Sequence, residues 1–196
     1  MIVKELNLYK IKEMALDSGR AVYSVQQLAN LLAKPKNVAK VYLWRLAQKG
    51  LAKKLFQGRV SFIDDDYIIA SQLSEPCYIS LSSALLFHGL VKQVPQYVEC
   101  VTSKNSRNYN SLGVIYHKIP PALMYGYAKL RKAQSYIFVA EPEKAALDSL
   151  YLNQITGKAA RELLPNLDLG KLEGYAMRFN GRGANKLRKW LHAQKK

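Results

Sequence analysis

The stretch from Ser24 to Ile63 constrains the fold of this 196-residue chain more than any other part of it. Ser24, with Gln27 three residues later, forms the signature of a capping box, so a helix is expected to begin there. Leucines on one side of that helix give it a surface to bury. Pro35 fits the first turn of a second helix, because proline has no amide hydrogen and a fixed φ. The stretch therefore predicts two short helices joined by a tight connection.

The second helix, predicted over residues 36–49, is amphipathic. One face repeats apolar residues at helical spacing, and it comprises Ala39, Tyr42, Leu43, Leu46 and Ala47. The opposite face carries Asn37, Lys40, Val41, Trp44 and Gln48. Seven Lys or Arg and no acid lie between Lys34 and Lys54. A solvated helix usually mixes Glu with Lys at a spacing of four, whereas an acid-free face suits a polyanion, because each phosphate contact releases a counterion.

The residues after this helix predict a β-hairpin. Gly50 is expected to end the helix in the left-handed conformation. The β-prone runs 51–56 and 59–63 flank Gln57-Gly58, which is a plausible hairpin turn. Two helices followed by a two-stranded ribbon predict a winged helix-turn-helix, with the hairpin as its wing. The DNA-binding residues expected on the second helix and the wing are Lys36, Asn37, Lys40, Val41, Trp44, Arg45, Lys53, Lys54 and Arg59.

The same first domain, residues 1–70, is completed by segments on either side. Residues 4–18 repeat apolar side chains at helical spacing, and Gly19 can end that helix. Three acids, Asp64 to Asp66, follow the hairpin. They are predicted to form a turn or the cap of the next helix, 67–73, rather than a metal site, since neighbours on a strand point to opposite faces.

The second domain, residues 71–196, is predicted to be mixed α/β. Ser80 or Ser82 can cap a helix that Gly89 ends. The strands expected are 97–102, 114–119 and 136–139, with an exposed polar loop over 103–113. Pro142 opens a further helix, and three more are expected over 158–164, 168–178 and 184–193. The fold class predicted is therefore α+β, a winged helix-turn-helix followed by a mixed α/β domain that ends in basic helices.

The charge of the chain favours a nucleic acid or another anionic partner. There are 30 basic and 14 acidic residues, a formal charge of +16. From Arg178 onward there are seven basic residues and no acid, so a second DNA-contacting surface is expected at Arg182, Lys186, Arg188 and Lys189. Cys77 and Cys100 fit neither a zinc site nor a disulfide framework, and no signal pattern or membrane-spanning run is present. We expect a cytoplasmic protein without metal or cofactor.

Three other functions are compatible with the residues. Glu141, Glu143 and Asp148, with Lys144 beside them, could serve a nuclease or transferase, although acids at a helix N-terminus also complement the helix dipole. No phosphate-binding loop, dinucleotide fingerprint or zinc-protease helix is present, and we predict that the protein is not an enzyme. An RNA-binding or ribosome-associated module could stack bases on Tyr109, Tyr116, Tyr125 and Tyr127. A ligand-sensing regulator with a pocket in the second domain is the third alternative.

Three stretches resemble the AbiEi family of antitoxins and transcriptional regulators, found in type IV toxin–antitoxin and phage abortive-infection systems. They are Tyr42-Leu-Trp-Arg-Leu-Ala-Gln-Lys-Gly-Leu51, Tyr78-Ile-Ser-Leu-Ser-Ser-Ala-Leu-Leu-Phe-His-Gly-Leu90 and Ala140-Glu-Pro-Glu-Lys-Ala-Ala-Leu-Asp148. The first is shared by many regulators, whereas the order of all three is more specific. Together they span most of the chain.

This resemblance implies a transcriptional autorepressor that binds inverted repeats in its own promoter through the N-terminal domain. It also implies a C-terminal domain with antitoxin activity. The implied partner is a nucleotidyltransferase-like toxin encoded beside it, countered without a stable complex. Inverted repeats imply two copies on the operator, from a monomer or weak dimer in solution. A stand-alone regulator without antitoxin activity is the alternative within the family.

Overall fold

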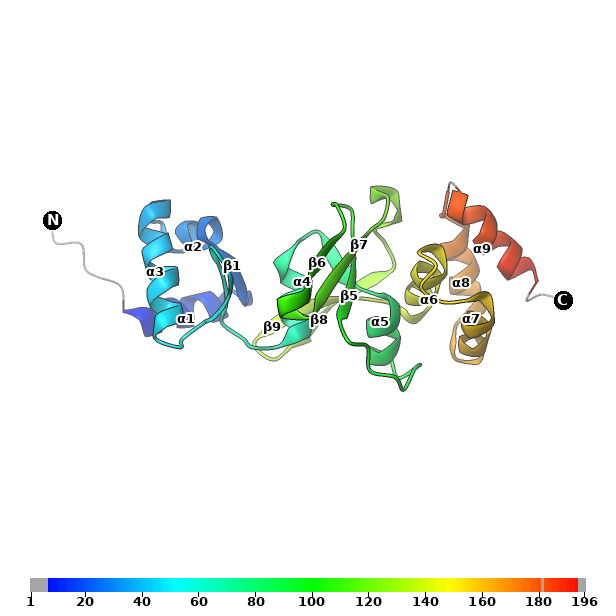
Figure 1. Cartoon of the computed structure of the whole chain (residues 1–196), viewed down its shortest axis with the longest axis horizontal. Coiled ribbons are helices and arrows are strands. Elements are labelled where there is room, and N and C mark those ends of the chain that lie inside the picture. The colour runs from blue at the N-terminus through cyan, green and yellow to red at the C-terminus, as the bar shows by residue number, and fades with distance from the viewer. Residues whose placement is uncertain (1–6, 181, 194–196) are drawn as a thin grey trace. The chain divides into compact units, whose positions relative to one another are not determined.

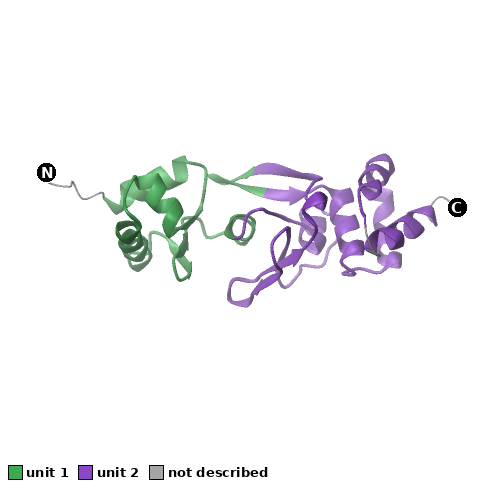
Figure 2. Ribbon diagram, turned by 90° about the horizontal axis from the view of Figure 1, so that it is seen from above, with its two compact units in different colours: residues 1–73, 131–137 green, residues 74–130, 138–196 purple. Residues whose placement is uncertain are grey.

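The computed structural model describes residues 7–180 and 182–193, and it has a mixed α+β fold. Its compact units are Met1–Leu73 with Arg131–Ile137, and Ser74–Leu130 with Phe138–Lys196 (Figure 2). The sequence placed the division after residue 70 and assigned all of 71–196 to the second domain. The grouping of 131–137 with the first unit differs from that prediction. No helix among the described residues is long and apolar enough to cross a membrane.

The first unit contains four helices and a three-stranded antiparallel sheet of order β1-β3-β2 within its described residues. The order along the chain is α1 (Leu8–Asp17), β1 (Val22–Ser24), α2 (Val25–Leu32), α3 (Lys36–Gln48), β2 (Lys53–Phe56), β3 (Arg59–Ser61) and α4 (Asp66–Leu73) (Figure 1). Residues 4–6 of the first predicted helix lie outside the described residues. Strand β1 was not predicted, so the expected two-stranded ribbon is a three-stranded sheet in which Val22 pairs with Ser61.

Several helices begin and end at the residues that the sequence predicts, although Pro35, expected in the first turn of α3, is its N-cap residue instead. Ser24 and Gln27 form both hydrogen bonds of the capping box at the start of α2. Gly50 has φ +66°, which is the left-handed conformation expected after α3. Asp65 caps α4, because its Oδ1 accepts a hydrogen bond from the Ile68 amide at 2.9 Å. The prediction that the Asp64–Asp66 acids form a turn or cap is therefore confirmed.

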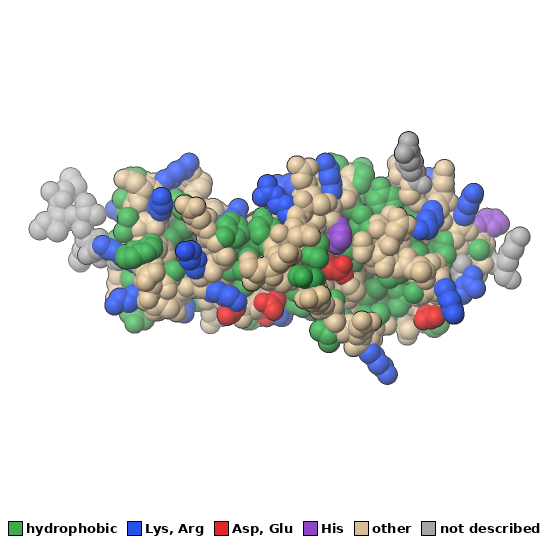
Figure 3. Space-filling view, in the orientation of Figure 1, with side chains coloured by type: hydrophobic (Ala, Val, Ile, Leu, Met, Phe, Trp, Pro, Cys, Tyr) green, Lys and Arg blue, Asp and Glu red, His purple; other side chains and the backbone are tan. Residues whose placement is uncertain are grey.

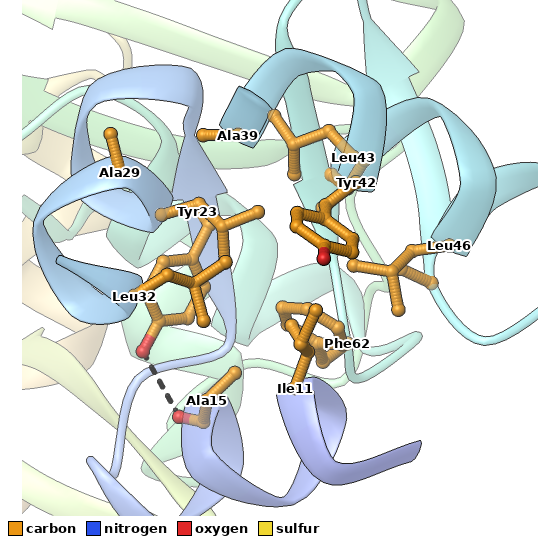
Figure 4. Packing of buried hydrophobic residues seen from close by; sticks show 13 residues of the cluster. Ile11, Ala15, Tyr23, Ala29, Leu32, Ala39, Tyr42, Leu43, Leu46 and Phe62 are labelled. Carbon is orange, nitrogen blue, oxygen red and sulfur yellow. Dashed lines mark hydrogen bonds between the residues drawn. The ribbon is translucent and has the colours of Figure 1, made fainter. Parts of the chain in front are cut away.

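The core of the first unit lies between α1, α2, α3 and the sheet. In Figure 4, Ile11 of α1, Tyr42 of α3 and Phe62 after β3 face one another, and all three are buried. The Tyr23 hydroxyl reaches across this core and donates to the Ala15 carbonyl at 3.0 Å. Apolar side chains from four separate segments thus hold α3 by one face, and that face is the stripe predicted from the sequence.

The second unit is built on a six-stranded mixed sheet of order β6-β7-β5-β4-β9-β8, of which only the 131–137 tip of the β8–β9 hairpin is grouped with the first unit. Its elements are β4 (Cys77–Ile79), α5 (Leu81–Phe87), β5 (Val98–Thr102), β6 (Arg107–Tyr109), β7 (Val114–Lys118), β8 (Tyr127–Lys132), β9 (Ser135–Ala140), α6 (Pro142–Tyr151), α7 (Gly157–Leu163), α8 (Leu169–Met177) and α9 (Arg182–His192). Three short 3-10 turns, Asn110–Leu112, Pro121–Leu123 and Leu164–Asn166, connect them. Strands β5 and β7 are parallel, with Val98 opposite Val114.

Three strands of this sheet were missed, and each lacks a strong local pattern. Strand β4 has three residues, and β6 lies within 103–113, which the sequence assigned to a loop. Strand β8 is an edge strand with the sequence Tyr-Ala-Lys-Leu-Arg-Lys, and basic side chains on an edge strand discourage pairing with another chain. The predicted strands at 97–102, 114–119 and 136–139 correspond to β5, β7 and β9 within one or two residues.

Gln72 of α4 attaches the β8–β9 hairpin tip to the first unit. Its Nε2 donates to Ser135 Oγ at 2.8 Å and to the Tyr136 carbonyl at 2.9 Å. Its Oε1 accepts from the backbone amides of Ala21 at 2.9 Å and Val22 at 3.1 Å. One buried amide group therefore joins α4, the start of β1 and the hairpin.

Candidate nucleic-acid interface

Helix α3 presents a cationic and partly apolar face to solvent. Its buried side is formed by Ala39, Tyr42, Leu43 and Leu46. The side chains predicted on the other face are exposed, and they include Asn37, Lys40, Val41, Trp44, Arg45 and Gln48. Two of them are large and apolar, with Val41 47% and Trp44 63% exposed. The helix therefore separates its two faces as its sequence pattern predicts.

A groove lies between α3 and the β2–β3 hairpin. Lys40, Trp44 and Gln48 line it from α3, and Lys54, Phe56 and Arg59 line it from the hairpin. The Arg59 guanidinium lies 5.9 Å from the centroid of the Phe56 ring, so the ring faces a cation within the groove wall. Cations on both walls and exposed aromatic surface give the groove the chemistry of a polyanion site.

The structure brings some predicted DNA-binding residues together and separates others. Lys40, Trp44, Lys54 and Arg59 share the groove. Lys36, Asn37, Val41 and Arg45 are exposed on α3 but do not line it. Lys53 is exposed on β2 and forms an ion pair with Asp64, so part of its charge is already neutralised. Figure 3 shows Lys and Arg side chains at many points on the visible surface and few Asp or Glu.

The basic residues predicted as a second surface belong to α9. Lys186 and Lys189 are exposed, and Lys186 also contacts the Asn153 side chain. Arg188 Nη2 donates to the Phe179 carbonyl at 3.2 Å, so this arginine also holds the second half of α9 against the chain before the helix. Helix α9 begins at Arg182, whose side chain lies outside the described residues.

The acids considered for catalysis do not converge on one site. Lys144 and Asp148 form a fully buried ion pair on α6, with 0% exposure of either side chain. Glu143 accepts from the Asp168 amide at 2.9 Å. Glu141 accepts from the Tyr175 hydroxyl at 2.7 Å and pairs with Lys171 at 2.8 Å. Glu141, Glu143 and Asp148 therefore make contacts in three separate places.

The Lys144–Asp148 pair is completed by residues far away in sequence. Asp148 Oδ2 accepts from the Tyr78 hydroxyl at 3.0 Å and from Ser80 Oγ at 2.8 Å. Lys144 Nζ lies 2.7 Å from the same tyrosine oxygen and 5.0 Å from the Tyr125 ring centroid. Burial lowers the pKa of Lys144, although Asp148 opposes that shift. Ser80, one of the two serines expected to cap α5, is its N-cap residue, but its side chain makes no capping hydrogen bond and donates to this carboxylate instead.

A second polar cluster escaped the sequence reasoning. Ser82 Oγ donates to Glu99 on β5, and His117 Nε2 on β7 lies 3.5 Å from the other carboxylate oxygen. Burial alone would raise the pKa of Glu99, but the contacts with His117 and Ser82 outweigh it and the pKa is lowered. Ser82 thus ties α5 to the sheet rather than capping a helix. Side chains alternate between the two faces of a strand, so the sequence could have placed Glu99 and His117 on one face only if the register between β5 and β7 had been known.

No group of three His, Cys, Asp or Glu side chains within 7–180 and 182–193 is arranged to hold a metal ion. Cys77 and Cys100 are buried free thiols. Neither a protein-family model nor a curated protein matches this chain.

Proposed function

We propose that the protein is a sequence-specific DNA-binding repressor of its own promoter, and that its first unit acts as a winged helix-turn-helix. The observation that carries this proposal is the acid-free outer face of α3 beside a cationic hairpin. The order α1-β1-α2-α3-β2-β3 supports it, because helix-turn-helix proteins place their second motif helix in the major groove. We place the repressor in the cytoplasm, with two copies on an inverted repeat.

In this proposal each cationic element has a separate role. Helix α3 enters the major groove, where Asn37, Lys40, Val41 and Trp44 face bases or sugar edges, and Arg45 reaches a phosphate. The positive end of the helix dipole, at Lys36, also attracts the phosphates of the DNA backbone. Lys53, Lys54 and Arg59 on the hairpin add contacts that do not depend on sequence. Residues Lys186 and Lys189 of α9, with Arg182 and Arg188, form a second contact surface.

Replacing Lys40 and Arg45 with Ala is expected to weaken binding to the protein's own upstream promoter fragment about tenfold or more, because the base or sugar contact of Lys40 and the phosphate contact of Arg45 are lost. A fluorescence titration across a salt series measures this. The slope of log affinity against log salt should fall by about one for each phosphate contact removed. Lys10→Ala with Lys12→Ala on α1 removes the same charge elsewhere and serves as the matched control.

A scrambled duplex of equal length decides whether the binding is specific. Specific systems prefer their sites by about 10³-fold or more at physiological salt. Equal and steeply salt-dependent affinity for both duplexes would reject a repressor and leave a general nucleic-acid module. Preference for structured RNA over either duplex would select the RNA-binding alternative. Adding Lys186→Ala and Lys189→Ala to the same titration tests the second surface, which is rejected if affinity is unchanged.

We further propose antitoxin activity for the second unit, which rests on the resemblance to the AbiEi family. Two of the three stretches that carry this resemblance lie in that unit, over β4–α5 and over the start of α6. They supply Tyr78, Ser80, Lys144 and Asp148, which form one buried cluster. Co-expression with the nucleotidyltransferase-like toxin that the resemblance implies should restore growth without a stable complex. Growth arrest that persists at equal expression would leave a stand-alone regulator.

A further inference from the structure

Val41 and Trp44 form an exposed apolar pair on a helix that is otherwise polar on its outer face. They are three residues apart, so they are neighbours on the α3 surface. Nearly half of Val41 and almost two-thirds of Trp44 are exposed. The core side of the same helix is already filled by other apolar residues, among them Tyr42 and Leu43. Contiguous exposed apolar area with a rim of polar residues marks an interaction site.

The surroundings of the pair indicate which partner covers it. Lys40 precedes Val41, Arg45 follows Trp44, and both cations are exposed. Trp44 also lines the groove with Lys54 and Arg59. The apolar pair is therefore flanked by cations, and no acid lies between Lys34 and Lys54. Such a surface complements a partner whose rim is anionic and whose interior carries a few apolar groups. The major groove of DNA has this composition, because the 5-methyl of thymine is the one methyl group among its polar base edges.

We propose that Val41 and Trp44 read thymine through its 5-methyl group and so determine part of the operator sequence. The inference rests on the proposed DNA-binding function and deepens it. Arg45 fixes the helix on the phosphate backbone, whereas the apolar pair discriminates between bases that present a methyl group and bases that do not. Cytosine lacks this methyl group, and 5-methylcytosine carries it at the same ring position.

Replacement of thymidine by deoxyuridine removes only the 5-methyl group of the base and leaves the base-pairing edge intact. A promoter fragment in which every thymine is replaced should bind the wild-type protein more weakly, by about fourfold for each methyl group contacted. The variant Val41→Ala, Trp44→Ala should bind the two fragments within twofold of each other. Lys40→Ala should weaken binding to both fragments and retain the wild-type ratio. Circular dichroism establishes that each variant is folded.

Scrambled duplexes with thymine and with deoxyuridine correct for any general effect of the base change. A wild-type protein that prefers the promoter over scrambled DNA, yet binds both promoter fragments equally, would overturn the thymine reading and leave the repressor proposal standing. Retention of the full thymine preference in the Val41→Ala, Trp44→Ala variant would also overturn it, because other residues would then read the methyl group. Loss of any promoter preference in the wild type rejects the proposed function and this inference together.

Discussion

Replacing Asp148 with Ala is expected to destabilise the second unit by about 3–5 kcal/mol, which is the usual effect of removing one partner from a buried ion pair. The Lys144 ammonium would remain with 0% exposure and without its counter-charge. The hydroxyls of Tyr78 and Ser80 would lose an acceptor as well. Chemical denaturation of the full chain, monitored by a signal from the second unit, measures the change in the free energy of unfolding.

Two further variants distinguish the effect of leaving a buried charge unpaired from the effect of removing any charge. Lys144→Met with Asp148→Leu removes both charges and should recover a large part of the stability, since apolar replacements of similar volume are often neutral or better. Lys171→Ala breaks the partly exposed Lys171–Glu141 pair and should change stability little, because solvent screens an exposed ion pair. An Asp148→Ala effect as small as that of Lys171→Ala would contradict the structural role of the buried pair.

The pH dependence of the Asp148→Ala variant follows from Lys144. Burial already lowers the pKa of Lys144, and Asp148 is what raises it again. Without Asp148 the pKa of Lys144 in the folded chain falls further below its ordinary value of 10.5, which the unfolded chain retains. Stability rises with pH wherever the unfolded state binds more protons. The loss of stability of Asp148→Ala relative to the wild type should therefore become smaller as pH rises from 7 toward 10.5. Denaturation at a series of pH values measures it.

Replacing Gln72 with Leu is expected to destabilise the first unit by about 3 kcal/mol or more. The backbone amides of Ala21 and Val22 would lose their acceptor, and the Ser135 hydroxyl and Tyr136 carbonyl would lose their donor. Each buried group left unpaired costs about 1–3 kcal/mol. Hydrogen exchange of the Ala21 and Val22 amides reports the change directly, because their protection depends on this side chain.

Gln26→Leu provides the matched control for Gln72→Leu. Gln26 is exposed on α2 and its side chain donates to Asn30, so its replacement should leave the Ala21 and Val22 amides protected. Persisting protection of both amides in Gln72→Leu would show that the hairpin tip is held to α4 by other contacts. Early exchange in the control variant would mean that the whole unit has lost stability rather than one hydrogen-bond network.

The sequence by itself determined the features that depend on neighbours within one or two turns. The two faces of α3, the capping box at Ser24, the left-handed Gly50 and the start of α6 at Pro142 all follow from such spacings. These signals act through local backbone geometry and the burial of one helix face, so they operate in any tertiary context. The exposed outer face of α3, on which the functional proposal rests, belongs to this group.

Only the tertiary structure decided the features that need a partner from elsewhere in the chain. Strand β1 has three residues and becomes a strand by pairing with β3, and the hairpin tip joins the first unit through Gln72. Lys144 and Asp148 have the spacing of an ordinary surface pair on a helix, yet Tyr78 and Ser80 enclose them in the core. Burial of a polar group depends on what packs over it, and a local pattern does not contain that information.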